Sequence, residues 1–283
     1  MGEVPVALVT GCSTGIGLHT ALRLAQAGYR VIATMRDTTR KVDLLEAARS
    51  AGLEIEIRAL DVADASSIDV CIAEVIAAHG GVDLLINNAG AGLVASIEQT
   101  SDDALRRIME VNFFGVWNTV KAVIPHMRAA GSGRVITVTS IGGLVGQPFN
   151  DAYCASKFAV EGFMESFAPL ALTMGIRLSV VAPGPVNSAF VANVRSTSRD
   201  AAAAMAPPYD RMLDRYNELS NQTFAGMGQT PDEIAQIIVD LSCADDPAFR
   251  VLTAPMVGAT VSAKASDPTG SGLIRSFAQV LGA

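Results

Sequence analysis

The chain has 283 residues, 50% of them hydrophobic and 17% charged, which is enough to bury a large core in one or two domains. Its net charge of −7 comes without a basic stripe, which argues against nucleic-acid binding. No apolar run approaches the ~20 residues that a membrane helix needs. The acidic start MGEVPVALVTG is unlike a signal peptide, so we expect a cytoplasmic protein with no integral membrane segment.

Cysteine and histidine spacing indicates neither a disulfide framework nor a metal site. The four cysteines contain no CxxC pair, and the three histidines show no HExxH-like spacing. We expect reduced thiols and no metal.

Along residues 5–184, short apolar segments alternate with helical ones. Segments rich in β-branched residues predict strands at 5–11, 30–35, 54–62, 82–90, 133–140 and 176–184. Helical apolar spacing occurs at 16–27, 66–79, 101–129 and from about 153 to 175. This alternation predicts βαβ units and a mainly parallel sheet. Because the strands are apolar without a period of two, we expect helices on both faces of the sheet.

Residues 187–229 interrupt the alternation and read as an insertion of short helices and loops. A good helix start follows at 230–233. The apolar residues of the insertion have two interpretations. They can form a lid over a bulky ligand, since Met adapts to irregular shapes, or they can form the insertion's own small core. These residues are Phe190, Met205, Tyr209, Met212, Tyr216, Phe224 and Met227. The tail 262–283 is weakly patterned. We predict one domain over 1–283, with 187–229 as a substrate-binding lid.

The stretch TGCSTGIG at 10–17 joins the first predicted strand to the first helix. Glycine permits positive φ and close backbone approach, and the helix start offers free N–H groups. Such a loop after the first strand of a βαβ unit predicts a pyrophosphate site. Its candidate cofactor-binding residues are Gly11, Ser13, Thr14, Gly15, Ile16 and Gly17.

The same letters also fit the G-x-S-x-G turn of serine hydrolases, with Ser13 as the nucleophile. A hydrolase of that kind needs a late histidine, but the last one here is His126. We therefore rank this alternative far below the dinucleotide site.

The end of the second strand bears on which dinucleotide is bound. An NAD site usually has an acidic residue there, to bond the ribose hydroxyls. Here the place falls on Met35, with Arg36 next, and an arginine can pair with a 2′-phosphate. The sequence therefore favours NADP(H), while Asp37, two places late, leaves NAD(H) open.

Polar and small residues follow the other strands, and the carboxyl ends of parallel strands lie at one edge, where ligands bind. Tyr153 and Lys157, in YCASK, open the helix after the fifth strand and share one face at i, i+4 spacing. A nearby ammonium favours the phenolate form of a tyrosine, so this pair can serve acid–base chemistry. The other strand-end residues are Asp61, Val62, Asn87, Asn88, Ala89, Gly90, Ser140, Pro183 and Gly184.

Together these motifs resemble the short-chain dehydrogenase/reductase family over about residues 5–190. They are TGxxxGIG at 10–17, NNAG at 87–90, Asn112, Ser140, Tyr153-x3-Lys157 and the PG turn at 183–184. GCSTGIGLH, ATMRD, GGLVGQPFNDAYCASKFAVEGF and GPVNSAF are most similar to the branch of estrogenic 17-beta-hydroxysteroid dehydrogenases and photoreceptor-type retinol dehydrogenases. The resemblance implies one α/β, Rossmann-like doubly wound domain with an about seven-stranded, mainly parallel sheet and a small helical lid.

The resemblance also implies roles for the residues that match. Tyr153 would be the general acid or base, Ser140 would hold the substrate oxygen, and Lys157 would hold the nicotinamide ribose. Asn112 would position a water that connects Lys157 to solvent. The remaining implied contacts are Asp61 and Val62 with the adenine, Asn88, Ala89, Gly90, Pro183 and Gly184 along the cofactor, Val186 with its carboxamide, and Gln147 and Asn150, beside Ser140 and Tyr153, with the substrate.

We therefore expect an NADP(H)-dependent oxidoreductase that interconverts a hydrophobic secondary alcohol and ketone, steroid-like or retinoid-like. The rival is a non-catalytic NADP-binding sensor on the same fold. The helices at 101–129 and 153–175 are the family's usual dimer surface, so the resemblance implies a homodimer or homotetramer. The tail after residue 250 matches the branch poorly, which weakens the transfer of its substrate to this chain.

Overall fold

The predicted apolar segments form the strands of one parallel sheet, and a short seventh strand extends its edge. The computed structural model describes residues 4–282. Its strands are β1 (Val6–Val9), β2 (Arg30–Met35), β3 (Glu56–Ala59), β4 (Leu84–Asn87), β5 (Gly133–Val138), β6 (Ile176–Ala182) and β7 (Arg250–Leu252).

The strand order is β3-β2-β1-β4-β5-β6-β7, with every neighbouring pair parallel. Leu8 of β1 pairs with Ile32 of β2 on one side and Leu85 of β4 on the other. The order reverses direction between β1 and β4, and ligands of doubly wound folds bind at such a switch point.

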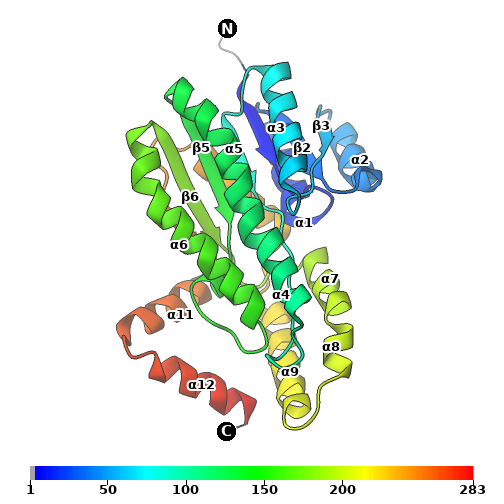
Figure 1. The fold of residues 1–283 in the computed structure, drawn as a ribbon, viewed down its shortest axis with the longest axis vertical. Coiled ribbons are helices and arrows are strands. Elements are labelled where there is room, and N and C mark those ends of the chain that lie inside the picture. The colour runs from blue at the N-terminus through cyan, green and yellow to red at the C-terminus, as the bar shows by residue number, and fades with distance from the viewer. Residues whose placement is uncertain (1–3, 283) are drawn as a thin grey trace.

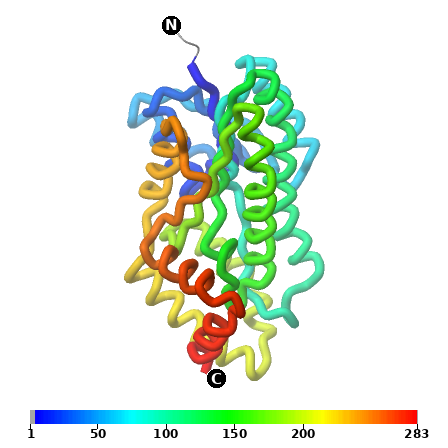
Figure 2. Tube along the Cα trace, turned by 90° about the vertical axis from the view of Figure 1, so that its left-hand side faces the viewer, coloured from blue at the N-terminus to red at the C-terminus, as the bar shows by residue number. Residues whose placement is uncertain are grey.

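Helices cover both faces of the sheet (Figures 1 and 2). The chain folds into α1 (Gly15–Gln26), α2 (Val42–Ser50), α3 (Ala65–His79), α4 (Asp102–Met109), α5 (Gly115–Ala130), α6 (Asp151–Thr173) and α10 (Pro231–Cys243). One buried cluster joins the sheet to α3, α5 and α6, and a second joins it to α1, α2 and α10. Every residue of β1 and β4 is buried, which explains why their sequences do not alternate.

Two further helical groups lie beyond the carboxyl ends of the strands (Figure 1). The insertion forms α7 (Ala189–Thr197), α8 (Arg199–Ala203) and α9 (Tyr209–Met227), and the tail forms α11 (Pro255–Ser266) and α12 (Ser271–Leu281). At 19 residues, α9 is longer than the short helices that the sequence predicted. The weakly patterned tail is helical, and Val257 packs with Ile141 and Val145 beside the candidate site.

The predicted helix at 101–129 is interrupted. A π-helical turn, η2 (Glu110–Phe114), separates α4 from α5 and carries Asn112. π-helical turns are rare in proteins, and those that occur within α-helices often lie at functional sites. Within residues 4–282, no helix has the length and apolar character needed to cross a membrane.

Candidate functional site

The glycine loop packs directly against the end of β4. A Cβ on Gly11, whose φ is +74°, would lie 2.8 Å from the Cα of Ala89. A Cβ on Gly17 would lie 2.4 Å from the Asn88 Nδ2 and 2.4 Å from the Gly11 carbonyl oxygen. Glycine at positions 11 and 17 is therefore required by this contact between the β1 and β4 ends.

Hydrogen bonds fasten the same contact. The Thr10 hydroxyl accepts from the amides of Asn88 (3.0 Å) and Ala89 (3.1 Å). The Asn88 Nδ2 donates to the carbonyl oxygens of Thr10 (2.8 Å) and Gly11 (3.1 Å). Asn88 thus supports the loop with its side chain, whereas the resemblance implied only a place along the cofactor. Thr10 was not singled out, because a threonine ending a strand is unremarkable in sequence.

The α1 N-terminus follows the loop. Thr14 is its N-cap and makes no side-chain capping hydrogen bond. The first-turn amides, with the positive end of the helix dipole, are therefore available to an anion between Ser13 and Ile16. A Cβ on Gly15 would meet Ser188 at 3.5 Å, so the beginning of the insertion lies beside this turn.

At the end of β2, Arg36 is exposed and Asp37 is engaged locally. The Asp37 Oδ1 accepts from the Thr39 amide (2.9 Å) and hydroxyl (2.7 Å), which caps the short 3-10 helix η1 (Thr38–Lys41). These hydrogen bonds, together with the nearby Arg40 and Arg36, lower the pKa of Asp37. Asp37, the carboxylate for which NAD(H) remained an alternative cofactor, thus has a capping role.

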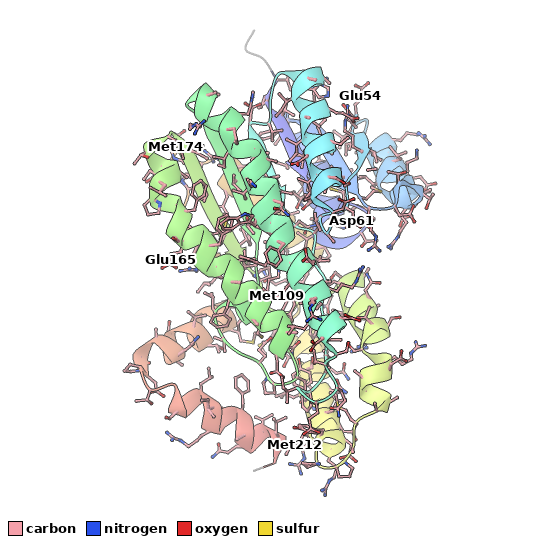
Figure 3. The ribbon with its side chains drawn as sticks, viewed as in Figure 1. Glu54, Asp61, Met109, Glu165, Met174 and Met212 are labelled. Carbon is pink, nitrogen blue, oxygen red and sulfur yellow. The ribbon has the colours of Figure 1, made fainter. Side chains whose placement is uncertain are left out.

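Asp61 and Val62 follow β3 at the same edge of the sheet. Figure 3 shows Asp61 beyond one end of β3 and Glu54 beyond the other end. The Asp61 Oδ1 accepts from the Ala63 amide at 3.0 Å, which fixes the turn. Val62 packs on Gly115, where a Cβ would lie 2.9 Å from the valine Cβ.

Ser140 and Tyr153 meet beyond the end of β5. Ser140 caps the 3-10 turn η3 (Ile141–Gly143), and its hydroxyl accepts from the Gly142 amide at 3.0 Å. The Tyr153 ring lies against Gly142, where a Cβ would be 3.1 Å from the tyrosine Cε1. Burial raises the pKa of Tyr153 to about 12, although a hydrogen bond with Ser140 lowers it.

Lys157 is 5% exposed, one helical turn after Tyr153. Its Nζ donates to the Val138 carbonyl oxygen at 3.0 Å and lies 6.0 Å from the centroid of the Tyr153 ring. Burial lowers the pKa of Lys157 to about 8, and the charge of Glu161 opposes this effect. The side chains alone therefore leave Tyr153 protonated at neutral pH, because burial outweighs the stabilisation of phenolate that the sequence suggested.

Asn112 is completely buried and connects the end of β4 to α6. Its Oδ1 accepts from the Ala91 amide (2.8 Å), and its Nδ2 donates to the Ala91 carbonyl (2.9 Å) and to the Ser156 hydroxyl (2.9 Å). Ser156 in turn donates to the Tyr153 carbonyl oxygen at 2.7 Å. The side chain of Asn112 thus fixes the backbone around the site, and its role in placing a water stays a prediction.

The residues predicted after β6 line the edge shared with the tail. The Pro183 carbonyl accepts from the Ile141 amide at 2.8 Å, and Gly184 lies against Met256 and Val257. Val186 is buried and forms an isolated bridge with Gln229, where the insertion returns to the sheet.

The insertion reaches the site at two points. Asn150 donates to the Tyr216 hydroxyl at 2.7 Å, and the Phe190 ring centroid is 6.2 Å from that of Tyr153. Gln147 is partly buried in the loop before Asn150. Tyr209, by contrast, donates to Glu98 at 3.0 Å on the exposed surface. The apolar residues of the insertion therefore divide between the site and the outside.

The histidines of the hydrolase alternative lie away from Ser13. His126 packs against Gly81, which precedes β4 at the opposite edge of the sheet, and His79 pairs with Glu56 at 2.8 Å. Among residues 4–282, no group of His, Cys, Asp and Glu side chains is arranged to hold a metal ion.

Sequence reasoning also missed Glu161, a buried carboxylate one turn after Lys157. It is 4% exposed, and its partners are Thr139, directly after β5, and Arg250 on β7. The repeated spacing Tyr153-x3-Lys157-x3-Glu161 was the available signal, since it predicts three residues on one helix face.

Comparison with known proteins agrees with the fold. The short chain dehydrogenase family model matches residues 5–199. Human 17-beta-hydroxysteroid dehydrogenase type 1 is 38% identical over 275 residues, covering 95% of this chain and 83% of the relative, and bovine retinol dehydrogenase 8 is 38% identical over 282 residues, covering 97% and 90%. A variant of actinorhodin polyketide ketoreductase solved with NADPH superposes with a TM-score of 0.77 at 29% identity, covering 90% and 97% of the two chains. The chain belongs to the short-chain dehydrogenase family and is an oxidoreductase of that family, which confirms the family and the fold class that the sequence predicted.

The glycine contact gives a prediction about stability. Gly17→Ala forces the loop away from Asn88, and we expect a loss of about 1–3 kcal/mol in the free energy of unfolding, as for other overpacked sites. Gly162→Ala is the matched control, because it also lies in a helix but has nothing within 4 Å of a new Cβ. That control should be neutral or more stable by up to about 1 kcal/mol. Equal urea midpoints for both variants would show that the contact is not tight.

Proposed function

We propose that the protein is an NADP(H)-dependent oxidoreductase that interconverts a hydrophobic secondary alcohol and its ketone. The observation that carries the proposal is the convergence of Ser140, Tyr153 and Lys157 beyond the end of β5. Gly90, in the segment held by the glycine loop, is next to Lys157, since a Cβ there would be 3.9 Å from the Nζ. The three side chains therefore adjoin the place where a dinucleotide would lie.

The residues at the switch point fit a nicotinamide dinucleotide. Gly11 and Gly17 let the backbone approach a pyrophosphate, and the α1 amides supply donors for it. Asp61, Val62 and the backbone of Asn88 to Gly90 would hold the adenosine side and the middle of the cofactor. Lys157 would hold the nicotinamide ribose, and Pro183, Gly184 and Val186 would meet the nicotinamide end.

The proposed reaction assigns one task to each side chain. A nicotinamide held by these residues would supply the hydride for reduction of the carbonyl carbon, or accept it from the alcohol carbon in the reverse direction. In reduction, Tyr153 donates its phenolic proton to the carbonyl oxygen, which becomes the hydroxyl group. Ser140 donates a hydrogen bond to that same oxygen and holds it beside Tyr153. A pKa of about 12 keeps Tyr153 protonated at neutral pH, which suits the acid of the reduction.

The substrate that we propose is steroid-like or retinoid-like. The names of the two relatives, a hydroxysteroid dehydrogenase and a retinol dehydrogenase, support this class. The apolar groups near Tyr153 support it too, because the Phe190 ring lies beside that of Tyr153, and Phe149 packs against Tyr216 with centroids 5.7 Å apart.

The first test replaces the proposed acid. Tyr153→Phe should lower the rate of NADPH-dependent ketone reduction by about 10²–10⁴-fold, because the proton donor is lost. The assay uses a panel of steroid, retinoid and small aromatic ketones and aldehydes, and NADPH binding is followed by fluorescence. Tyr29→Phe is the control, since Tyr29 bonds the Ser242 carbonyl away from the site.

Other outcomes of that assay discriminate the alternatives. Undiminished turnover by Tyr153→Phe would refute the mechanism. Tight NADPH binding with no turnover by the wild type would favour the sensor. Turnover of only small polar alcohols would reject the steroid-like or retinoid-like substrate.

We also propose that Arg36 selects NADP(H). Asp37 is occupied as a cap, and Arg36 is exposed at the end of β2, where a 2′-phosphate would lie. Arg36→Gln should raise the KM for NADPH about 10- to 100-fold, the loss of a charge-assisted hydrogen bond, and leave the KM for NADH nearly unchanged. Arg49→Gln on α2 is the control. A wild type that prefers NADH would contradict the proposal.

Finally, we propose a homodimer formed through the outer faces of α5 and α6, with a homotetramer as its further assembly. Trp117 of α5 packs on Phe163 of α6 with centroids 4.7 Å apart, and Phe114, Trp117 and Leu170 leave apolar area exposed on this face. A second copy related by two-fold symmetry would cover both helices at once.

Charge placed on that face should dissociate the assembly. Trp117→Arg should yield monomers by size-exclusion chromatography with light scattering, because an arginine cannot be buried there unpaired. Ile97→Arg, at an exposed apolar residue elsewhere, should retain the wild-type mass. A monomeric wild type, or an unchanged mass for Trp117→Arg, would reject the proposed interface.

A further inference from the structure

Glu161 continues the row of side chains that begins with Tyr153 and Lys157 on α6. Residues at i and i+4 of a helix are neighbours on one face. Gly143 of η3 packs onto the turn between the last two members, because a Cβ there would lie 3.0 Å from the Glu161 Cγ and 3.0 Å from the Lys157 carbonyl oxygen. The carboxylate is thus held beneath the loop that presents Ser140.

Residues at the end of β5 and on β7, the two strands that flank β6, fix this carboxylate. Thr139, next to Ser140, donates its hydroxyl hydrogen to the Glu161 Oε1 at 2.5 Å. The Arg250 Nε donates to Oε2 at 3.0 Å, and the same guanidinium donates to Glu165 at 2.7 Å. The Arg250 side chain is 29% exposed, so solvent screens it in part, while the Glu161 side chain is 6% exposed. A buried charge is costly unless it is paired, and here the pairing is built from three elements.

Lys157 is the other buried charge of this region, and few titratable groups face it. On its own helix these are Tyr153 and Glu161. The groups facing it from β5, η2 and the end of β4 are neutral: the Val138 carbonyl, Asn112 and Gly90. Arg250 of β7 and Glu165 act on Glu161 rather than on Lys157 directly. Among residues 4–282, Glu161 is therefore the negatively charged residue that neighbours Lys157.

We propose that Glu161 is a positioning residue of the site, whose fixed negative charge keeps the buried Lys157 in its ammonium form. The inference rests on the proposed function for its consequence, since the ammonium is the form that would hold the nicotinamide ribose and stabilise a tyrosinate. Its physical part, the coupling between the two side chains, rests on their i, i+4 placement on one face of α6 and on the burial of both charged groups. Burial lowers the pKa of Lys157 to about 8, close to neutral pH, so loss of the opposing charge matters there.

The coupling can be measured without turnover. The chain has four lysines, so the Lys157 signal can be resolved in the full-length protein labelled with ¹³C-lysine and assigned with Lys157→Arg. In Glu161→Gln the titration midpoint of Lys157 should fall by about half a pH unit or more, because a neighbouring opposite charge is lost. Glu165→Gln is the matched control, because the Glu165 carboxylate bonds the same Arg250 but its side chain is 65% exposed. Figure 3 shows Glu165 at the outer side of α6. In Glu165→Gln the titration midpoint of Lys157 should stay unchanged.

Arg250→Gln provides a change of opposite sign and covers the case in which Glu161→Gln does not fold. Removing the cation that partly neutralises Glu161 should raise the Lys157 midpoint. An unchanged midpoint in every folded variant of this pair would overturn the proposal. So would a Glu161→Gln protein that is only less stable to heat, with the Lys157 midpoint of the wild type.

The pH profile of ketone reduction separates this inference from the proposed function. The ammonium is present below the Lys157 pKa and is lost as the pH rises through it, so activity should fall on the alkaline side. In Glu161→Gln this alkaline limb should move to lower pH by the shift seen in the lysine titration, whereas in Glu165→Gln it should not. If the titration shifts while the wild type reduces no ketone, the coupling stands and the proposed function fails.

Discussion

The close contact between the glycine loop and the end of β4 is the constraint on which the candidate site depends. Gly11 lies on the Ala89 backbone, and the Thr10 hydroxyl holds the two amides that follow β4. These are the central strands, where the order of the sheet reverses. Any side chain at position 11 would separate them. It would also displace the segment that runs on to Ala91, whose backbone is bonded to Asn112.

A second constraint is the burial of an ammonium group beside that contact. Taking an amine out of water costs several kcal/mol unless other groups compensate it. The Val138 carbonyl accepts one hydrogen bond from Lys157, and the charge of Glu161, which Arg250 holds, opposes the effect of burial on the pKa of Lys157. The edge strand β7 is only three residues long, yet it carries this arginine. The electrostatics of the site are therefore tied to the closing strand of the sheet, far from the site in sequence.

The sequence was sufficient to predict the architecture and the residues that gather at one edge of the sheet, because both follow from local patterns. Strands ending in Asp61, Asn87 and Ser140 must bring those ends together once the strands are parallel. It was insufficient for properties set by distant contacts. The Asn150–Tyr216 hydrogen bond spans 66 positions and the Glu161–Arg250 pair spans 89.

The protonation of Tyr153 was beyond prediction for a related reason. The spacing of the tyrosine and lysine suggests that the ammonium favours phenolate, which is correct in direction for an isolated pair. The extent of burial decides the balance, and burial is a property of everything packed around the helix. Here it raises the pKa of the phenol and lowers that of the amine together.

The segments after residue 185 that surround the site, the insertion and the tail, are attached to the rest of the protein at a few separate points. The Lys264 Nζ donates to the Leu144 carbonyl at 2.6 Å, so α11 braces the loop that carries Ser140. The insertion returns to the sheet through the bridge between Val186 and Gln229. Between these attachments its contacts are made by individual side chains such as Tyr216. The groups proposed for chemistry thus lie at the end of β5 and on α6, whereas those proposed for substrate choice lie in the loop before α6 and on the helices of the insertion. This separation lets one fold keep its reaction while its substrate changes.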